Sequence, residues 1–200
     1  MHRMEVLRRE LPGGGVLTFD PAFLTLDDAD RALAALLEEV PFEQRDIVMF
    51  GKRVAQPRLV AWLGDPGARY KYSGVTLDPL PWSPTLAALR DRVAERAGHP
   101  FNSVLANLYR DGQDSMGFHA DDEPELGVDP VLASLSLGAT RTFVLKARAS
   151  GVADERISLT HGSLLVMGGR LQSTHRHGVP KERRVHGPRI NLTFRRIVEV

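Results

Sequence analysis

Apolar residues follow two different spacings in the two halves of this chain. In the first half they recur every three or four residues over 28–40 and 84–97, which is the spacing of amphipathic helices. The first helix is predicted to run from about Asp28 to Val40, where Pro41 stops it. Its apolar face consists of four residues: Leu33, Leu36, Leu37 and Val40.

The second predicted helix has clear signals at both ends. Ser83 is a suitable N-cap, Pro84 suits the first helical position, and Gly98 is a suitable terminator. The apolar positions between them are Leu86, Leu89 and Val93. Segments 58–64 and 70–77, which lie between the two helices, are rich in apolar, β-branched and aromatic residues and are predicted to be strands.

From Asn102 onward the pattern predicts strands only. Short apolar segments alternate with Gly, Pro, Asp or Ser at 103–110, 131–138, 141–147, 156–160, 163–169 and 189–200. Such spacing is typical of an antiparallel sandwich or jelly roll. We therefore expect an α+β protein, with the N-terminal helices and strands packed outside the jelly roll.

Composition narrows the possible chemistry. A chain of 200 residues with 42% hydrophobic content can form one substantial core, so a single domain is expected. The sequence contains no cysteine, which excludes disulfides and thiolate ligands, so a metal ion would have to use His, Asp or Glu. No apolar run reaches about 18 residues and no signal peptide is recognisable, so we expect a soluble, cytoplasmic protein without membrane contact.

Charge is distributed unevenly although the net charge is only +1. Residues 20–43 are mostly acidic, which is most simply a solvated helix face. Residues 51–72 and 170–196 are rich in Lys and Arg, and these basic zones are suited to phosphate contacts.

The last predicted strand has two faces of different character, because side chains alternate along a strand. One face carries Ile190, Leu192 and Phe194, and the other carries Arg189, Asn191, Thr193 and Arg195. The apolar face belongs to a core. The two arginines lie roughly 20 Å apart at about 3.3 Å per residue, so their long side chains, reaching inward, would leave room for a small dicarboxylate. The planar fork of Arg can hold a carboxylate with two hydrogen bonds.

A second set of polar residues stands where strands are dense. His119 and Asp121 are two positions apart, so on a strand they would share a face, as would Asn107 with Tyr109 and His175 with His177. Two histidines and one carboxylate form the facial triad that holds non-haem iron and leaves positions open. The alternative is a capping or salt-bridged pair, because such tripeptides often arise by chance.

Several motifs together resemble the AlkB family of Fe(II)/2-oxoglutarate dioxygenases, and within it the animal DNA repair demethylase homologues. They are "NLYRDGQDSMGFHADDEPELG", "ASLSLGATRTFVL", "HGSLLVMGG", "HGVPKE" and "PRINLTFR". The resemblance covers roughly residues 48–198 and implies a double-stranded β-helix fold. On this basis residues 102–200 are interpreted as the catalytic core, and 1–101 as an N-terminal extension with nucleotide-recognition segments.

The resemblance also assigns the metal ligands and the anchors of the co-substrate. It makes His119, Asp121 and His177 the Fe(II) ligands; His177 is preferred to His175 because it directly precedes "GVPK". Arg189 would bind the distal carboxylate of 2-oxoglutarate, and Arg195 the carboxylate beside its keto group. Asn107, Tyr109 and Asn191 would add hydrogen bonds.

The reaction implied by the resemblance is oxidative dealkylation with O₂. Decarboxylation of 2-oxoglutarate to succinate accompanies hydroxylation of an N-methyl group on a base such as 1-methyladenine or 3-methylcytosine, and formaldehyde is released. The partner would be single- or double-stranded DNA, or RNA, and the protein would act as a monomer. Two alternatives are a dioxygenase acting on modified RNA or a protein side chain, and a nucleic-acid-binding module that has lost catalysis.

A base within a duplex cannot reach a buried iron, so the resemblance implies that the base is flipped out or already single-stranded. Five residues would then contact the nucleic acid: Phe50 as a wedge, Tyr70 and Tyr72 on a recognition strand, and Asp122 and Glu123 at the edge of the base. Each has a simpler alternative. Phe50 would be a core residue, the two tyrosines would be half-buried strand residues, and Asp122 and Glu123 would be acids of a solvated turn.

Overall fold

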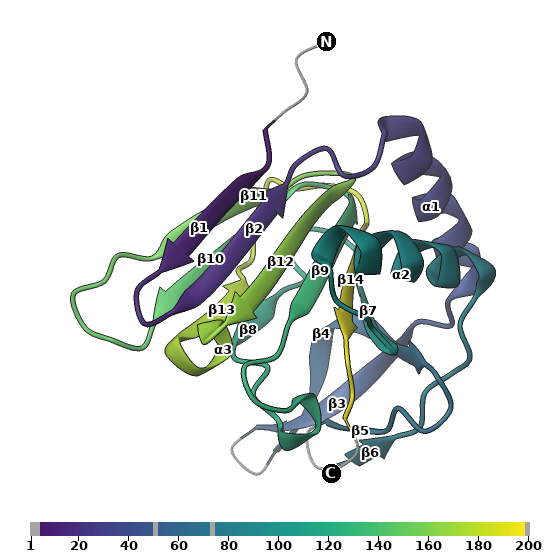
Figure 1. Ribbon diagram of the computed structural model, residues 1–200. Helices are drawn as coiled ribbons and strands as arrows, with labels where there is room; N and C mark the ends of the chain where they lie inside the picture. Colours follow the sequence, from purple (N-terminus) through teal and green to yellow (C-terminus); the bar gives the residue numbers. More distant parts are fainter. Residues whose placement is uncertain (1–4, 50–51, 73–74, 199–200) are drawn as a thin grey trace.

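Two antiparallel sheets face each other in the computed structural model, which describes residues 5–49, 52–72 and 75–198 (Figure 1). The larger sheet has the strand order β1 (Leu7–Leu11), β2 (Gly15–Asp20), β12 (Ser163–Gly169), β9 (Leu132–Gly138), β14 (Arg189–Arg195), β7 (Ser103–Tyr109), β4 (Lys52–Gly64) and β3 (Glu43–Met49). The smaller sheet has the order β11 (Glu155–Leu159), β10 (Arg141–Ala147), β13 (His175–Val179) and β8 (Met116–His119). The predicted α+β jelly roll is confirmed.

The last predicted strand is central in this arrangement. β14 pairs with β7 on one side and with β9 on the other, with Asn191 opposite Asn107 and Ser136. Because both neighbours are antiparallel and in continuous register, every second residue of β14 points between the sheets. The predicted alternation of its side chains is confirmed, and Ile190 and Leu192 are fully buried on the opposite face.

Two helices cover the outer face of the larger sheet (Figure 1). α1 (Leu26–Glu39) starts two residues before the predicted point, because Thr25 caps it by accepting a hydrogen bond from the backbone N–H of Asp28 at 3.1 Å. α2 (Pro84–Ala97) starts and ends as predicted, with the side chain of Ser83 as its N-cap and Gly98 in the left-handed region at φ 62°.

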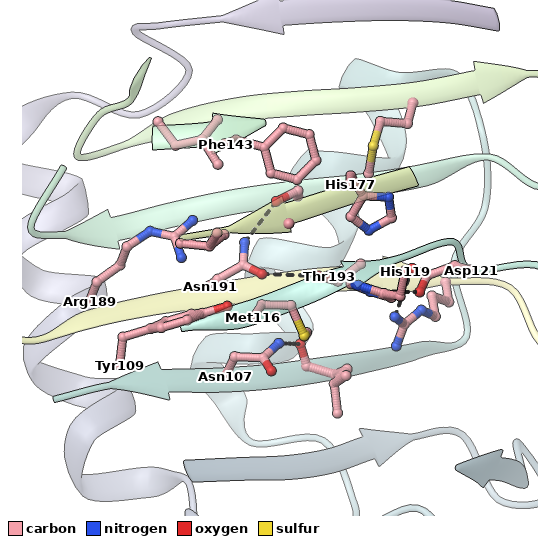
Figure 2. Close-up of a pocket in the computed structure, with 17 residues that line it drawn as sticks. Asn107, Tyr109, Met116, His119, Asp121, Phe143, His177, Arg189, Asn191 and Thr193 are labelled. Carbon is pink, nitrogen blue, oxygen red and sulfur yellow. Dashed lines mark hydrogen bonds and ion pairs between the residues drawn. The ribbon is translucent and has the colours of Figure 1, made fainter. Parts of the chain in front are cut away.

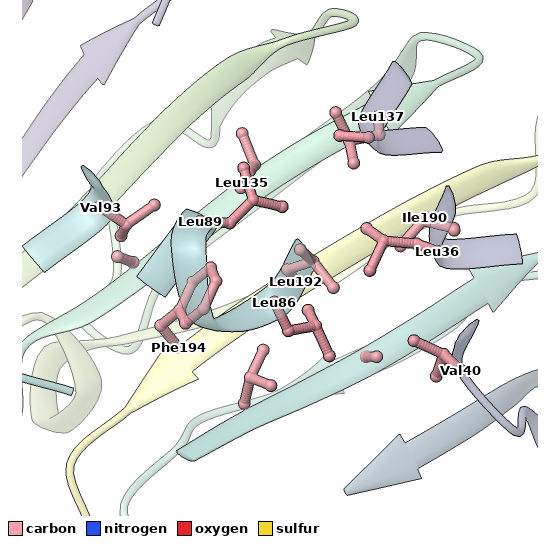
Figure 3. Packing of buried hydrophobic residues seen from close by; sticks show 14 of the residues in the cluster. Leu36, Val40, Leu86, Leu89, Val93, Leu135, Leu137, Ile190, Leu192 and Phe194 are labelled. Atoms are coloured by element: carbon pink, nitrogen blue, oxygen red, sulfur yellow. The ribbon is translucent and has the colours of Figure 1, made fainter. Parts of the chain in front are cut away.

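The helices and the sheet enclose the main hydrophobic core. Figure 3 shows Leu36 and Leu86 from the helices packed over Leu192 and its neighbours on β9 and β14. Burial of one such leucine stabilises the fold by about 1.5–3 kcal/mol. The face predicted for the first helix was partly wrong. Leu37 is 42% exposed, because Ala29 and Ala32 complete the buried stripe instead.

Strands from the N-terminal half extend the larger sheet at both of its ends. At one end β1 pairs with β2, which pairs with β12; at the other end β3 pairs with β4, which pairs with β7. β5 (Tyr70–Tyr72) and β6 (Val75–Leu77) form a separate two-stranded sheet. The division at residues 101 and 102 stays a prediction, since strands from both segments share the larger sheet. Within the described ranges, no helix is long and apolar enough to cross a bilayer.

Candidate metal and co-substrate site

A polar cavity lies between the inner faces of the two sheets. The larger sheet contributes residues from β7, β9 and β14, and the smaller sheet contributes residues from β8, β10 and β13 (Figure 2). The polar lining residues are Asn107, Tyr109, His119, Asp121, Ser134, His177, Arg189, Asn191, Thr193 and Arg195. The eight candidates that the sequence assigned to metal and co-substrate binding are therefore brought together.

The two histidines and the aspartate converge at one end of this cavity. Ligand atoms of His119, Asp121 and His177 all lie within 4.8 Å of one another. His119 and His177 are directly opposite each other on paired strands, with ring centroids 4.4 Å apart. Asp121 lies two residues beyond the end of β8, so the prediction that it shares a strand face with His119 was wrong. The irregular segment that follows the strand brings its carboxylate to the histidines instead.

Asp121 is held in place by a contact that sequence reasoning missed. Its backbone N–H donates to the side-chain Oε1 of Gln172 at 3.0 Å. Gln172 is 1% exposed and belongs to the short helix α3 (Leu171–Thr174), 51 residues further along the chain. A lone Gln in a short connection gives no periodic signal, so only the tertiary structure reveals this support.

Hydrogen bonding orients the imidazole of His119. Its Nδ1 lies 2.9 Å from the carbonyl oxygen of Gly117, which fixes Nδ1 as the protonated donor, and Nε2 lies 3.4 Å from Asp121 Oδ1. His177 stacks on Phe143 at 5.3 Å between ring centroids, and among the described residues its buried Nδ1 has no hydrogen-bond partner. Two imidazoles and a carboxylate whose ligand atoms converge in this way fit a divalent metal ion that prefers nitrogen and oxygen ligands.

The charges at this end of the cavity favour the ligand forms of these groups. Burial would raise the pKa of Asp121, but the Arg195 guanidinium, 2.8 Å away, and the two histidines hold that pKa well below its usual range. Burial and the charge of His119 lower the pKa of His177 to about 3, so His177 is neutral at physiological pH. Burial opposes protonation of His119, but the hydrogen bond and charge of Asp121 raise its pKa overall.

His175, the alternative distal histidine, is outside this group. It is 3% exposed and lies 2.9 Å, through Nδ1, from the hydroxyl of Thr174. It stands opposite Ala147, the last residue of β10, whereas His177 stands opposite Leu145, two residues further from the end of that strand. The geometry therefore favours His177 as the partner of His119.

The opposite end of the cavity holds Arg189. This side chain is 1% exposed, and its Nη2 donates to Ser136 Oγ at 2.9 Å. Its Nε and Nη1 have no hydrogen-bond partner among the described residues. Burial lowers the pKa of Arg189 to about 10, so the guanidinium stays charged at neutral pH. A buried cation with two open donors fits a carboxylate ligand.

Side-chain amides line the space between the two ends. Asn191 donates to Ser134 Oγ at 2.7 Å, and its Oδ1 accepts from the hydroxyl of Thr193 at 3.0 Å (Figure 2). Asn107 accepts from Nε of Arg58 at 2.8 Å. These contacts fix the orientation of both amides and leave them beside the cavity. The roles of Ser134 and Arg58 were missed, because neither residue stands in a distinctive motif.

The candidate nucleic-acid contacts are described only in part. Asp122 is exposed and forms an ion pair with Arg148 at 3.0 Å, and Glu123 is the N-cap residue of the short 3₁₀ helix Pro124–Leu126. Phe50 lies outside the described residues. Tyr70 and Tyr72 are in β5, but their side chains lie outside the described part of the structure.

Comparison with known proteins gives one family. The model of the 2OG-Fe(II) oxygenase superfamily matches residues 16–195. The human alpha-ketoglutarate-dependent dioxygenase alkB homolog 3 is 44% identical over 186 residues, which are 88% of this chain and 64% of that protein. The chain thus spans slightly less than two thirds of the length of that relative.

Two further relatives are covered more completely. The mouse DNA oxidative demethylase ALKBH2 is 41% identical over 181 residues, covering 86% of this chain and 76% of that protein. The human DNA oxidative demethylase ALKBH2 is 38% identical over 216 residues, covering 96% of this chain and 83% of that protein. The solved structure of OsALKBH1 matches with a TM-score of 0.66 at 18% identity, covering 95% of this chain and 100% of that chain, which supports the fold alone.

Proposed function

The chain belongs to the AlkB family within the 2OG-Fe(II) oxygenase superfamily, and from this premise we propose that it repairs N-alkylated bases in DNA by oxidative demethylation. One observation carries the proposal: a cluster of His119, Asp121 and His177 and a buried arginine with open donors occupy the two ends of one cavity. The names of the ALKBH2 relatives, which are DNA oxidative demethylases, support the choice of substrate.

We assign His119, Asp121 and His177 as ligands of Fe(II), which when bound supplies the chemistry that activates O₂. Arg189 would bind the distal carboxylate of 2-oxoglutarate through its open Nε and Nη1, and Arg195, beside Asp121, would bind the carboxylate next to the keto group. The amides of Asn107 and Asn191 and the hydroxyl of Tyr109 would complete its hydrogen bonds. These groups bind and orient the co-substrate, while the apolar walls exclude water.

The overall reaction balances without a further reductant. O₂ and 2-oxoglutarate are consumed, one oxygen atom enters succinate as CO₂ is lost, and the other enters the N-methyl group as a hydroxyl. The C–N bond of the hydroxymethyl group then breaks, which gives formaldehyde and the unmodified base. The protein's contribution is to hold the methyl carbon beside the metal ligands.

Recognition of the base is assigned to five further residues. Asp122 and Glu123 follow the ligand Asp121 directly, so their carboxylates suit the cationic or amino edge of a methylated base. Tyr70 and Tyr72 would contact and stack on the flipped base, and Phe50 would fill the space it leaves in a duplex.

The cellular setting is also a proposal. The chain has no cysteine, which is compatible with the reducing cytoplasm, and we propose that it acts there as a monomer. Size-exclusion chromatography with light scattering and cell fractionation test these two points. A stable dimer or a membrane-associated pool would contradict them.

The proposed function is tested with oligonucleotides that carry 1-methyladenine or 3-methylcytosine. Single- and double-stranded DNA and RNA are incubated with Fe(II), 2-oxoglutarate and ascorbate, and base repair and formaldehyde are measured. We expect repair by the native protein and by His175→Ala, and a loss of more than about a hundredfold in His177→Ala, since a ligand is removed. Turnover of 2-oxoglutarate without repair would indicate another substrate, and absence of turnover would indicate a binding module.

A further inference from the structure

Arg141 is a buried arginine to which the proposed function gives no role. It is the first residue of β10 and is 1% exposed. By strand alternation it shares the inner face of the smaller sheet with Phe143, which lines the cavity. A buried guanidinium is costly unless it is extensively hydrogen-bonded, so its surroundings indicate why it is there.

The donors of Arg141 connect two loops at one end of the sandwich. Nη1 donates to the carbonyl of Asp111 at 3.2 Å, and Nη2 donates to the carbonyls of Asp114 at 2.9 Å and Pro180 at 2.6 Å. Its Nε lies 3.6 Å from Glu182 Oε1. Arg141 thus ties the loop after β7 to the loop after β13.

Backbone hydrogen bonds join the same two loops. Gly112 donates to the carbonyl of Val185 at 3.0 Å, and Glu182 donates to the carbonyl of Gly112 at 2.8 Å. A Cβ at position 112 would come 1.9 Å from the carbonyl oxygen of Glu182, so the loops approach as closely as glycine permits. The two loops, one starting after Tyr109 and the other ending at Arg189, are therefore held tightly together.

Tyr109 connects Arg141 to the candidate co-substrate site. The Arg141 guanidinium carbon lies 5.5 Å from the centroid of the Tyr109 ring, and the Arg189 guanidinium carbon lies 5.1 Å from the same centroid. Tyr109 is 2% exposed and lines the cavity. A tyrosine ring in contact with two cations is held by cation–π attraction as well as by packing.

We propose that Arg141 is a positioning residue for the co-substrate, which fixes Tyr109 and adds a second positive charge at the Arg189 end of the cavity. The inference rests on the proposed function in assigning 2-oxoglutarate to this cavity. Its consequence is selectivity: the added charge favours keto acids that carry a second carboxylate over those that end in a methyl group.

The expected effect follows from the charge. A unit charge at about 8–10 Å in a medium of effective dielectric constant about 20 changes the affinity for an anion by roughly fifteen- to thirtyfold. Glu182 lies beside Arg141 and is partly exposed, so it offsets part of this field, and a smaller effect of about tenfold is expected.

Binding is measured by titration calorimetry, anaerobically, on the Mn(II)-loaded full chain, without nucleic acid. The ligands are 2-oxoglutarate and 2-oxopentanoate, which has the same number of carbons but no distal carboxylate. Arg141→Met is compared with Arg141→Lys, which keeps the charge, and with Arg156→Met, which removes an exposed arginine from neighbouring β11. Circular dichroism and thermal unfolding establish that each variant is folded.

We expect Arg141→Met to weaken 2-oxoglutarate binding about tenfold and 2-oxopentanoate binding less than about twofold. Arg141→Lys should restore most of the discrimination, and Arg156→Met should resemble the native protein. In turnover, Arg141→Met should raise KM for 2-oxoglutarate and leave KM for the oligonucleotide unchanged.

Three results would overturn the inference: equal weakening of both keto acids, no weakening of 2-oxoglutarate binding, or no binding of 2-oxoglutarate to the native protein. If Arg141→Met does not fold, Arg141→Lys provides the test. This variant keeps the positive charge, so a loss of its preference for 2-oxoglutarate over 2-oxopentanoate would contradict a role for the charge. Selective loss of 2-oxoglutarate binding in a protein that repairs no methylated base would refute the proposed substrate and leave the role of Arg141 standing.

Discussion

Replacement of Asp121 by asparagine should destabilise the metal-free protein far more than replacement of its neighbour Asp122. Asp121 and Arg195 each have 3% of the side chain exposed and are joined at 2.8 Å, whereas Asp122 and Arg148 have 56% and 41% exposed and are joined at 3.0 Å. The two pairs thus have similar geometry and differ chiefly in burial, which makes them a matched comparison.

The magnitude follows from that difference. The gross attraction of the buried pair is about 6 kcal/mol at an effective dielectric constant of about 20. Removal of one partner of a buried pair typically costs about 3–5 kcal/mol, because the other charge stays buried. Asparagine still accepts a hydrogen bond from Arg195, so we expect about 3 kcal/mol for Asp121→Asn. Exposed pairs contribute about 0–1 kcal/mol, so Asp122→Asn should cost less than about 1 kcal/mol.

Urea unfolding of the native protein and both variants, each in excess EDTA, measures these free energies. A divalent ion added afterwards should raise the melting temperature of the native protein and of Asp122→Asn but leave Asp121→Asn nearly unchanged, because it lacks the carboxylate ligand. Equal free energies for the two variants, or a variant of Asp121 more stable than the native protein, would refute the stabilising role of the buried Asp121 carboxylate.

Three further outcomes are expected. Gln172→Leu should weaken Co(II) binding about 10- to 100-fold, because the Asp121 backbone loses its support; unchanged affinity in a spectroscopic titration would contradict this. Burial would raise the pKa of Asp114. Its carboxylate accepts hydrogen bonds from both the side chain and the backbone N–H of Arg110, and these contacts hold the pKa below the ordinary value. Because the native pKa is lowered, the resulting stabilisation is present above about pH 4 and is lost as the pH falls through the native pKa. Urea unfolding between about pH 5 and pH 2 should therefore show a smaller loss of stability for Asp114→Asn than for the native protein. Gly138→Ala should cost roughly 2 kcal/mol or more, because φ is +89° and the new Cβ would lie 2.3 Å from a backbone oxygen; a melting temperature within about 1 °C of the native value would disprove this strain.

Features with a local physical cause were predictable from the sequence. α2 is bounded by a side-chain cap at Ser83 and a left-handed turn at Gly98, and both residues act within one turn of the helix. The alternation along β14 was equally clear, because a central strand is constrained on both faces. The approximate position of the cavity followed from that alternation and from the motif around His119.

Features set by long-range pairing were not predictable. The β1–β2 hairpin lies at the edge of the larger sheet, where most side chains of β1 are exposed and the periodic signal is weak. The irregular segment that brings Asp121 to His119 is held by Gln172, which is distant in sequence. The burial of Arg141 was not predictable, because the carbonyls that accept its hydrogen bonds belong to loops 27–39 residues away.

The division of the cavity between two sheets has a consequence for the motions of the protein. His119 and His177 belong to the smaller sheet, and Arg189 and Arg195 belong to the larger one. A metal ion held by the histidines, together with a co-substrate held by the arginines, would act as a cross-link between the two sheets, and separation of the sheets would require their release. Amide hydrogens of β13 and β14 should then slow their exchange together on binding, so the sandwich and its ligand would open as one unit.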